Sequence, residues 1–232
     1  MKKVLRFLFI LLSGVIPICK SFDIEDGVSF ADKTTFAHNF VRDLHLVQNL
    51  EWDADLASEA QKYAEVLAVE NSIQHSQGAK NGYYGENLYK GFDGFKRTKS
   101  VAEAVYYWYL EIGLYDFNNP APNLEEVGHF TELVWRSTGR VGCGYSVAEM
   151  YGGLMTYIVC RYRPQGNLDG LFLQNVLPLR NGAFIPNSPN QLEAPIGCID
   201  TFHDCVNWLG VCRQQVFRGL MLRYCKKTCN IC

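Results

Sequence analysis

The chain has 232 residues, of which 48% are hydrophobic and 13% aromatic, and its formal net charge at neutral pH is −2. This composition excludes a largely disordered protein and predicts a domain of ordinary size with a real hydrophobic core. The acidic balance argues against a nucleic-acid-binding protein, because such binding depends on neutralising phosphates.

The first residues have the pattern of an export signal. A basic stretch that ends at Arg6 precedes an apolar run from Phe7 to Ile16, which is too short to span a bilayer. We therefore expect a cleaved signal peptide over residues 1–21. No later stretch reads as a membrane helix, so we expect a secreted, extracellular protein.

Three amphipathic helices are predicted in the first half of the mature chain. Asp53 and Ser100 stand where N-caps of the second and third helices are expected. The apolar positions recur at helical spacing. They are Phe36, Phe40, Leu44 and Val47; Leu56, Ala60, Tyr63 and Leu67; and Val101, Ala104, Trp108, Ile112 and Tyr115.

Two strands follow in "VGCGYSVA" and "LMTYIVCRY", and the Gly152-Gly153 pair between them predicts a hairpin. In this hairpin Cys143 and Cys160 fall roughly opposite each other, within the separation that a disulfide can bridge. We therefore interpret Cys143 as a structural disulfide partner and not as a catalytic thiol.

The C-terminal part divides into two segments. Residues 164–197 hold five of the eight prolines and show no sustained periodicity, so we expect a wrapping segment and linker over residues 169–197. Six cysteines crowd into residues 198–232, which predicts a separate disulfide module. They are Cys198, Cys205, Cys212, Cys225, Cys229 and Cys232.

Four polar residues are candidates for a functional site. Glu111 projects from the apolar side of the third predicted helix, and Glu86 lies between aromatic neighbours in "YYGENLY". His75 and His129 stand in expected loops. Burying such groups without partners costs several kcal/mol or shifts their pKa values. By contrast, we expect His38 to be a buried hydrogen-bonding residue, and Trp108 and Trp135 to belong to the core.

Five segments resemble, in order and spacing, the CAP superfamily of cysteine-rich secretory, antigen 5 and class 1 pathogenesis-related proteins. They are "AHNFVRDLH", "HSQGAKNGYYGENLY", "WYLEIGLYDF", "GHFTELVWRSTGRVGCGY" and "YIVCRYRPQGN". The resemblance implies an α+β fold, a three-layer α-β-α sandwich, which we assign to residues 30–168. It also implies a shared cleft that contains His75, Glu86, Glu111 and His129. Glu132 departs from the family pattern, in which Gln or Ala is common at this position.

Three interpretations of this tetrad stay open. His75 and His129 could bind zinc or another divalent cation, with the carboxylates as direct or indirect partners. Alternatively, the four side chains could form a buried hydrogen-bonded network. A metal-dependent hydrolase, with Glu86 or Glu111 as general base, ranks below both, because no GxSxG or HExxH motif is present.

A lipid-binding hypothesis rests on three aromatic residues. Tyr84, Tyr89 and Phe92 fit a spacing that resembles the sterol-binding loop proposed for some CAP proteins. An apolar ligand could enter such a loop if it is flexible.

The last 35 residues resemble the ShKT module, with its terminal "CxxxCxxC". Of the fifteen possible pairings of six cysteines, the resemblance implies Cys198–Cys232, Cys205–Cys225 and Cys212–Cys229. The lysine–aromatic pair of channel-blocking toxins is missing, and Arg218 or Arg223 is no simple replacement. We therefore favour an interaction module over a channel blocker.

Together these features predict a secreted CAP protein with a C-terminal ShKT module that binds an extracellular protein or lipid ligand. The alternatives are a metal-dependent hydrolase, and a venom or effector protein whose ShKT module modulates an ion channel.

Overall fold

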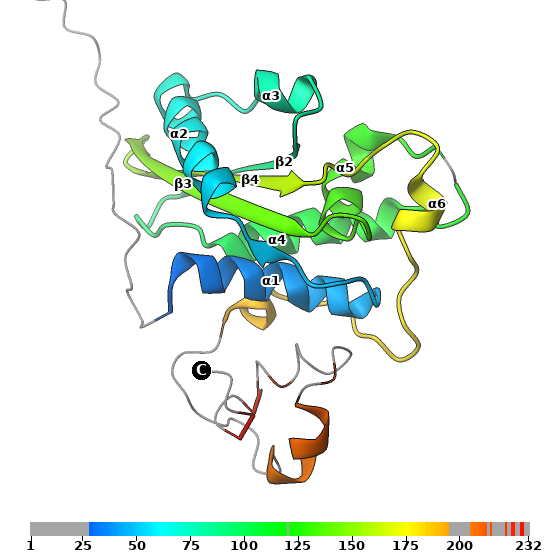
Figure 1. The fold of residues 1–232 in the computed structure, drawn as a ribbon. Helices are drawn as coiled ribbons and strands as arrows, with labels where there is room; N and C mark the ends of the chain where they lie inside the picture. The colour runs from blue at the N-terminus through cyan, green and yellow to red at the C-terminus, as the bar shows by residue number, and fades with distance from the viewer. Residues whose placement is uncertain are drawn as a thin grey trace, which may run out of the picture.

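The computed structural model describes residues 28–119, 121–194 and 205–212, together with single positions at 214, 221, 224, 225, 228 and 229. The expected signal peptide lies outside the described residues. Between residues 28 and 194 the chain forms the predicted α+β sandwich, in which helices cover both faces of one sheet (Figure 1).

The sheet has four strands in the order β1-β3-β4-β2. The short β1 (Glu51–Trp52) runs parallel to β3 (Arg140–Met150), whereas β4 (Gly153–Arg163) pairs antiparallel with β3 and with β2 (Gly85–Asp93). The turn between β3 and β4 confirms the predicted hairpin. Cys143 and Cys160 are directly opposite in its register and form the predicted disulfide.

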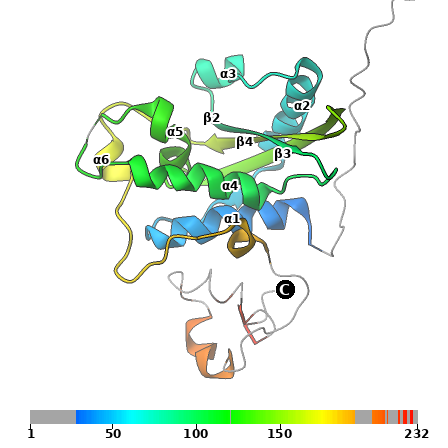
Figure 2. The same ribbon diagram turned by 180° about the vertical axis from the view of Figure 1, so that it is seen from behind.

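The helices lie on two sides of this sheet. Helices α2 (Ala54–Glu70) and α3 (Gln77–Lys80) lie on one side, and α1 (Phe30–Leu44) and α4 (Val101–Leu110) lie on the other, as the two opposite views agree (Figures 1 and 2). Helix α5 (Leu124–Leu133) follows the 3-10 helix η1 (Glu111–Leu114). The predicted caps are confirmed, because the side chains of Asp53 and Ser100 accept hydrogen bonds from the first turns of α2 and α4.

The main core fills the space between the sheet and helices α1, α4 and α5. Trp108 and Trp135 are buried in it, as predicted. His38 is fully buried as well, with Nδ1 at 2.8 Å from the Thr34 carbonyl and Nε2 at 3.0 Å from the Tyr162 hydroxyl. This histidine is therefore the predicted buried hydrogen-bonding residue.

A second core lies between α2 and the other face of the sheet. In this core the backbone of α2 approaches the backbone of β3 closely. Its helix contributes the small side chains Ala60, Ala64 and Ala68. A Cβ atom at Gly144 would lie 2.3 Å from the Gln61 backbone, so α2 can rest on β3 only where β3 has no side chain.

The segment after β4 wraps over the α1 and α4 side. It contains α6 (Phe172–Asn175) and the 3-10 helix η2 (Pro189–Leu192), whose Leu192 is fully buried. Arg180 N donates to the Leu44 carbonyl at 2.8 Å, and the Ser100 hydroxyl donates to Glu193 at 2.5 Å. These contacts attach the proline-rich segment to α1 and to the start of α4.

The C-terminal module is described in part, with the 3-10 helix η3 (Cys205–Val211). The disulfides Cys205–Cys225 and Cys212–Cys229 are formed, as the resemblance implies. The expected Cys198–Cys232 bond lies outside the described residues, and so do Arg218 and Arg223.

Substituting Gly144→Ala should lower the free energy of unfolding by about 3 kcal/mol, because the new methyl group would force α2 away from β3. Chemical denaturation measures this change. Gly113→Ala is the matched control, since a Cβ there meets nothing within 4 Å. Equal stabilities of the two variants would contradict this account of the packing.

Candidate functional site: two histidine–carboxylate pairs in one cleft

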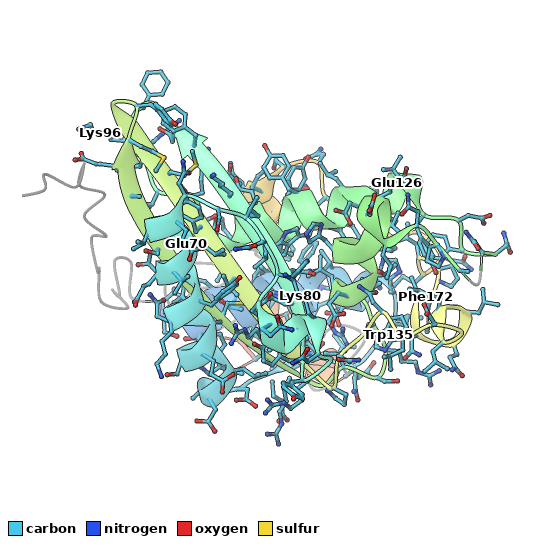
Figure 3. The ribbon with its side chains drawn as sticks, turned by 90° about the horizontal axis from the view of Figure 1, so that it is seen from above. Glu70, Lys80, Lys96, Glu126, Trp135 and Phe172 are labelled. Atoms are coloured by element: carbon cyan, nitrogen blue, oxygen red, sulfur yellow. A yellow bond between two sulfur atoms is a disulfide. The ribbon has the colours of Figure 1, made fainter. Side chains whose placement is uncertain are left out.

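A cleft opens between α3, the beginning of β2, α5 and the segment that follows β4. In Figure 3, Lys80 marks the end of α3 and Glu126 marks α5, the two helices that border it. Three of the four predicted tetrad residues, His75, Glu86 and His129, are among its lining residues. Glu132 also lines the cleft, so the departure from the family pattern lies within the site itself.

The first pair joins His75 to Glu86. Glu86 is the second residue of β2 and is paired with Arg161 of β4, so that a guanidinium lies beside a fully buried carboxylate. The carboxylate accepts hydrogen bonds from His75 Nδ1 at 3.1 Å, from the amide and hydroxyl of Ser76 at 2.8 Å each, and from Arg161 Nε at 3.1 Å.

These donors decide the ionisation of Glu86. Burial alone would raise its pKa, but the hydrogen bonds from His75 and Ser76 and the charge of Arg161 hold the pKa below its ordinary value. Glu86 is therefore an ionised carboxylate that fixes the orientation of the His75 ring.

The second pair joins His129 to Glu111. His129 Nδ1 lies 2.6 Å from Glu111 Oε1, while Glu111 Oε2 accepts from the backbone amides of His129 and Phe130 at 3.0 Å each. The His129 ring also stacks on Trp108, with ring centroids 6.1 Å apart. The carboxylate and the indole together hold this imidazole in one orientation.

The structure corrects two details of the prediction. His129 belongs to helix α5 and not to a loop. Glu111 does not project from the third helix, because α4 ends at Leu110 and Glu111 begins η1. This change of helical geometry turns the Glu111 carboxylate toward the backbone of α5, a local effect that helical periodicity does not predict.

In both pairs the carboxylate is at Nδ1, which leaves Nε2 of each ring for another partner. A carboxylate that accepts from Nδ1–H fixes the tautomer in which Nε2 carries the lone pair. Half of the His75 side chain and about a third of the His129 side chain are exposed in the cleft. The arrangement therefore offers two oriented nitrogen ligands.

Glu132 differs from the two paired carboxylates. It is buried against the backbone of Gly85 and Gly166, where any Cβ atom would collide with its carboxylate. Both of its oxygens accept from the single Gly166 amide, at 2.9 and 3.1 Å. Burial raises the pKa of Glu132 to about 7, although the Gly166 hydrogen bond and the Arg42 charge act in the opposite direction.

Sequence reasoning missed the roles of Ser76 and Arg161. Ser76 caps α3 and bonds to Glu86 through both its amide and its hydroxyl. Arg161 interrupts the apolar run of β4 and is almost fully buried between the Tyr63 and Tyr84 rings. A charge inside an apolar strand was the available signal, because a buried guanidinium needs an acceptor.

The three residues of the lipid hypothesis do not form a loop. Tyr89 and Phe92 lie on strand β2, where successive side chains point to opposite faces. Tyr89 stacks on Tyr107 of α4, whereas the buried Tyr84 lies under Arg161 on the α2 side. Tyr89 and Phe92 therefore belong to a strand and not to the expected loop, whereas lipid binding at these three residues stays a prediction.

A buried cluster outside the cleft also has ligand-type atoms. His38, Cys143 and Cys160 bring a nitrogen and two sulfurs within 4.8 Å of one another. The sulfurs are joined in a disulfide and so are not thiolates, and both His38 nitrogens are already hydrogen-bonded. This buried cluster therefore offers fewer available ligand atoms than the two cleft histidines.

Residues 35–162 match the CAP family, described as the cysteine-rich secretory protein family. The chain belongs to this family. Residues 197–232 match the ShK domain-like family.

Relatives come from fungi, plants and animals. Protein PRY2 of Saccharomyces cerevisiae is 38% identical over 151 residues, which cover 65% of the chain and 42% of PRY2. Human Golgi-associated plant pathogenesis-related protein 1 is 37% identical over 152 residues, or 64% of the chain and 93% of the relative. The chain spans less than two thirds of the fungal proteins PRY2 and RBT4, at 42% and 36% of their lengths.

Two solved structures share the fold. BmVAL-1 has a TM-score of 0.50 at 23% sequence identity. The match covers 65% of this chain and 83% of the BmVAL-1 chain. The structure titled "Crystal structure of NaASP2 with Zn2+" has a TM-score of 0.51 at 22% identity, with coverages of 69% and 91%. At these identities the likeness establishes the CAP fold alone.

Glu132→Gln should change how stability depends on pH. Between about pH 4.5 and about pH 7 the folded protein holds a proton on Glu132 that the unfolded chain has lost, so this residue makes unfolding easier as pH rises through that window. The full shift corresponds to about 3 kcal/mol. The variant should therefore gain stability over the wild type as pH rises from 4.5 to above 7.

Denaturation at a series of pH values measures this difference. His38 and His45, whose pKa values burial lowers to about 4, act in the opposite direction in both proteins and cancel in the comparison. Glu126→Gln on the exposed side of α5 is the matched control and should run parallel to the wild type. A Glu132→Gln curve parallel to the wild type would show that Glu132 ionises normally.

Proposed function

We propose that this chain is a secreted binding protein whose cleft holds a divalent metal ion of the zinc type at His75 and His129. One observation carries the proposal: each imidazole donates Nδ1–H to a carboxylate, at 3.1 Å and 2.6 Å, and so turns a ligand nitrogen to the same cleft.

The donor set fits zinc. Neutral imidazoles oriented by carboxylates are common zinc ligands, and the outer carboxylates make the ring nitrogens more basic. Two protein ligands leave further coordination positions for a ligand from outside. A bound ion would supply Lewis acidity there. The solved structure of NaASP2 with Zn2+, a protein of the same fold, agrees with this proposal.

Binding is a better interpretation than hydrolysis, because both oxygens of each tetrad carboxylate already accept hydrogen bonds. Glu86 accepts four hydrogen bonds, one of them from a guanidinium, and Glu111 accepts three. A general base must instead have a free oxygen within reach of the proton that it takes. The carboxylates therefore act as positioning residues for the histidines.

Secretion is part of the proposal. The basic and apolar N-terminal pattern supports it, and one relative carries the name Secreted protein RBT4. Across the part of the chain that the structure describes, no helix has the length and apolar character needed to cross a membrane.

Zinc titration by calorimetry tests the site. The wild type should bind one ion, and His75→Ala and His129→Ala should each abolish detectable binding or weaken it more than tenfold, because each removes one of two ligands. Glu86→Gln and Glu111→Gln should weaken it by about 10–100-fold through misorientation of the rings.

Gln165→Ala serves as the control for these variants, since Gln165 lines the same cleft without a ligand role. It should leave the zinc dissociation constant unchanged. Wild-type protein without zinc affinity, or histidine variants that retain it, would overturn the proposal.

A further inference from the structure

Three aromatic side chains are exposed together at the end of the sheet far from the cleft. Phe95 is 86% exposed in the turn after β2, and Tyr151 is 83% exposed in the β3–β4 turn. Phe92, which is 44% exposed, lies with its ring 6.4 Å from the Tyr151 ring. We call Phe92, Phe95 and Tyr151 the aromatic tip. Figure 3 shows neighbouring Lys96 at this end of the molecule, away from Trp135 and Phe172.

Backbone geometry sets the aromatic tip apart from ordinary surface loops. Tyr151 has φ of 54° and Gly152 has φ of 76°, as a tight two-residue hairpin turn requires. Such positions favour Asn or Gly, and a bulky side chain there is uncommon. Lys96 is also left-handed, with φ of 58°. A large aromatic residue kept at an unfavourable position suggests that the side chain itself has a role.

Asp93 holds Phe95 in place. Its buried carboxylate accepts hydrogen bonds from the amides of Phe95 at 2.8 Å and Arg97 at 3.3 Å, and it also pairs with the Arg97 guanidinium at 3.1 Å. Phe95 is therefore presented on an ordered turn, and little conformational freedom is lost when it contacts a partner.

The charge around the aromatic tip is opposite in sign to that of the whole chain. Residues 90–103 and 149–155 contain four basic and three acidic side chains, a net charge of +1, whereas the whole chain carries −2. The Lys96–Glu149 ion pair is exposed on both sides, so it is weak and leaves the ammonium group available. The basic residues are Lys90, Lys96, Arg97 and Lys99.

We propose that the aromatic tip docks on the surface of an anionic lipid bilayer. Phe95 and Tyr151 would enter the boundary between headgroups and acyl chains, where aromatic rings are favoured, while Lys96 and Arg97 contact lipid phosphates and carboxylates. Projecting turns suit a flat, deformable surface, and the surrounding positive charge selects anionic headgroups.

This docking surface is independent of the metal cleft. Glu86 and Phe92 lie on the same strand and are separated by about 20 Å, at 3.3 Å per residue. Failure of one proposal therefore leaves the other intact, and the variant His75→Ala with His129→Ala should bind vesicles like the wild type.

Vesicle co-sedimentation of the full chain tests the proposal. The wild type should bind vesicles of phosphatidylcholine with phosphatidylserine, bind vesicles of phosphatidylcholine alone more weakly, and lose affinity at high salt. The double variant Phe95→Ser with Tyr151→Ser should bind the anionic vesicles at least about tenfold more weakly, because two inserted rings are lost.

Phe184→Ser is the matched control, because Phe184 is 87% exposed and lies in the segment that follows α6. It should bind like the wild type. As a second measurement, brominated lipids should quench the fluorescence added by Phe95→Trp and not that added by Phe184→Trp. The proposal is overturned if the wild type does not bind anionic vesicles or if the double variant binds them like the wild type. Equal quenching of Phe95→Trp and Phe184→Trp would also overturn it.

Discussion

The buried carboxylate of Glu86 is the constraint on which the rest of the cleft depends. An ionised group in this position is stable only with several donors, and the fold provides them from three residues of two segments: His75 and Ser76 before α3, and Arg161 on β4. The same hydrogen bonds that stabilise the charge fix the start of α3 against the sheet and orient the His75 ring. One side chain therefore both anchors the start of α3 and orients the His75 ring.

The Glu111 carboxylate is stabilised by two backbone amides of α5. The Glu132 carboxylate has only one backbone amide as a donor. With one amide for two oxygens, Glu132 keeps a raised pKa close to neutrality, whereas the donors around Glu86 lower its pKa. The cleft thus contains carboxylates with different ionisation behaviour. Strand β2 connects this polar cleft at one end to the aromatic tip at the other, so a single strand spans both proposed sites.

Much of the fold could be predicted from the sequence, because helix caps and turns depend on residues that are close together in the chain. The caps at Asp53 and Ser100 and the glycine turn of the hairpin depend on neighbouring residues alone. The Cys143–Cys160 pairing follows from the hairpin register. One departure from the prediction has a non-local cause: the segment with Tyr89 and Phe92 resembles a flexible loop by composition, but pairing with β4 makes it a strand. The departure at Glu111 is local, because α4 ends at Leu110.

The sequence by itself therefore determined the family, the helices, the hairpin and the residue types available for the cleft. Only the tertiary structure decided which nitrogen of each histidine faces its carboxylate, that Glu132 has a single donor amide, and that Phe95 and Tyr151 lie at the same end of the sheet. The physical reason is that hydrogen-bond partners, burial and the direction of a side chain depend on residues distant in the chain, which no local pattern records.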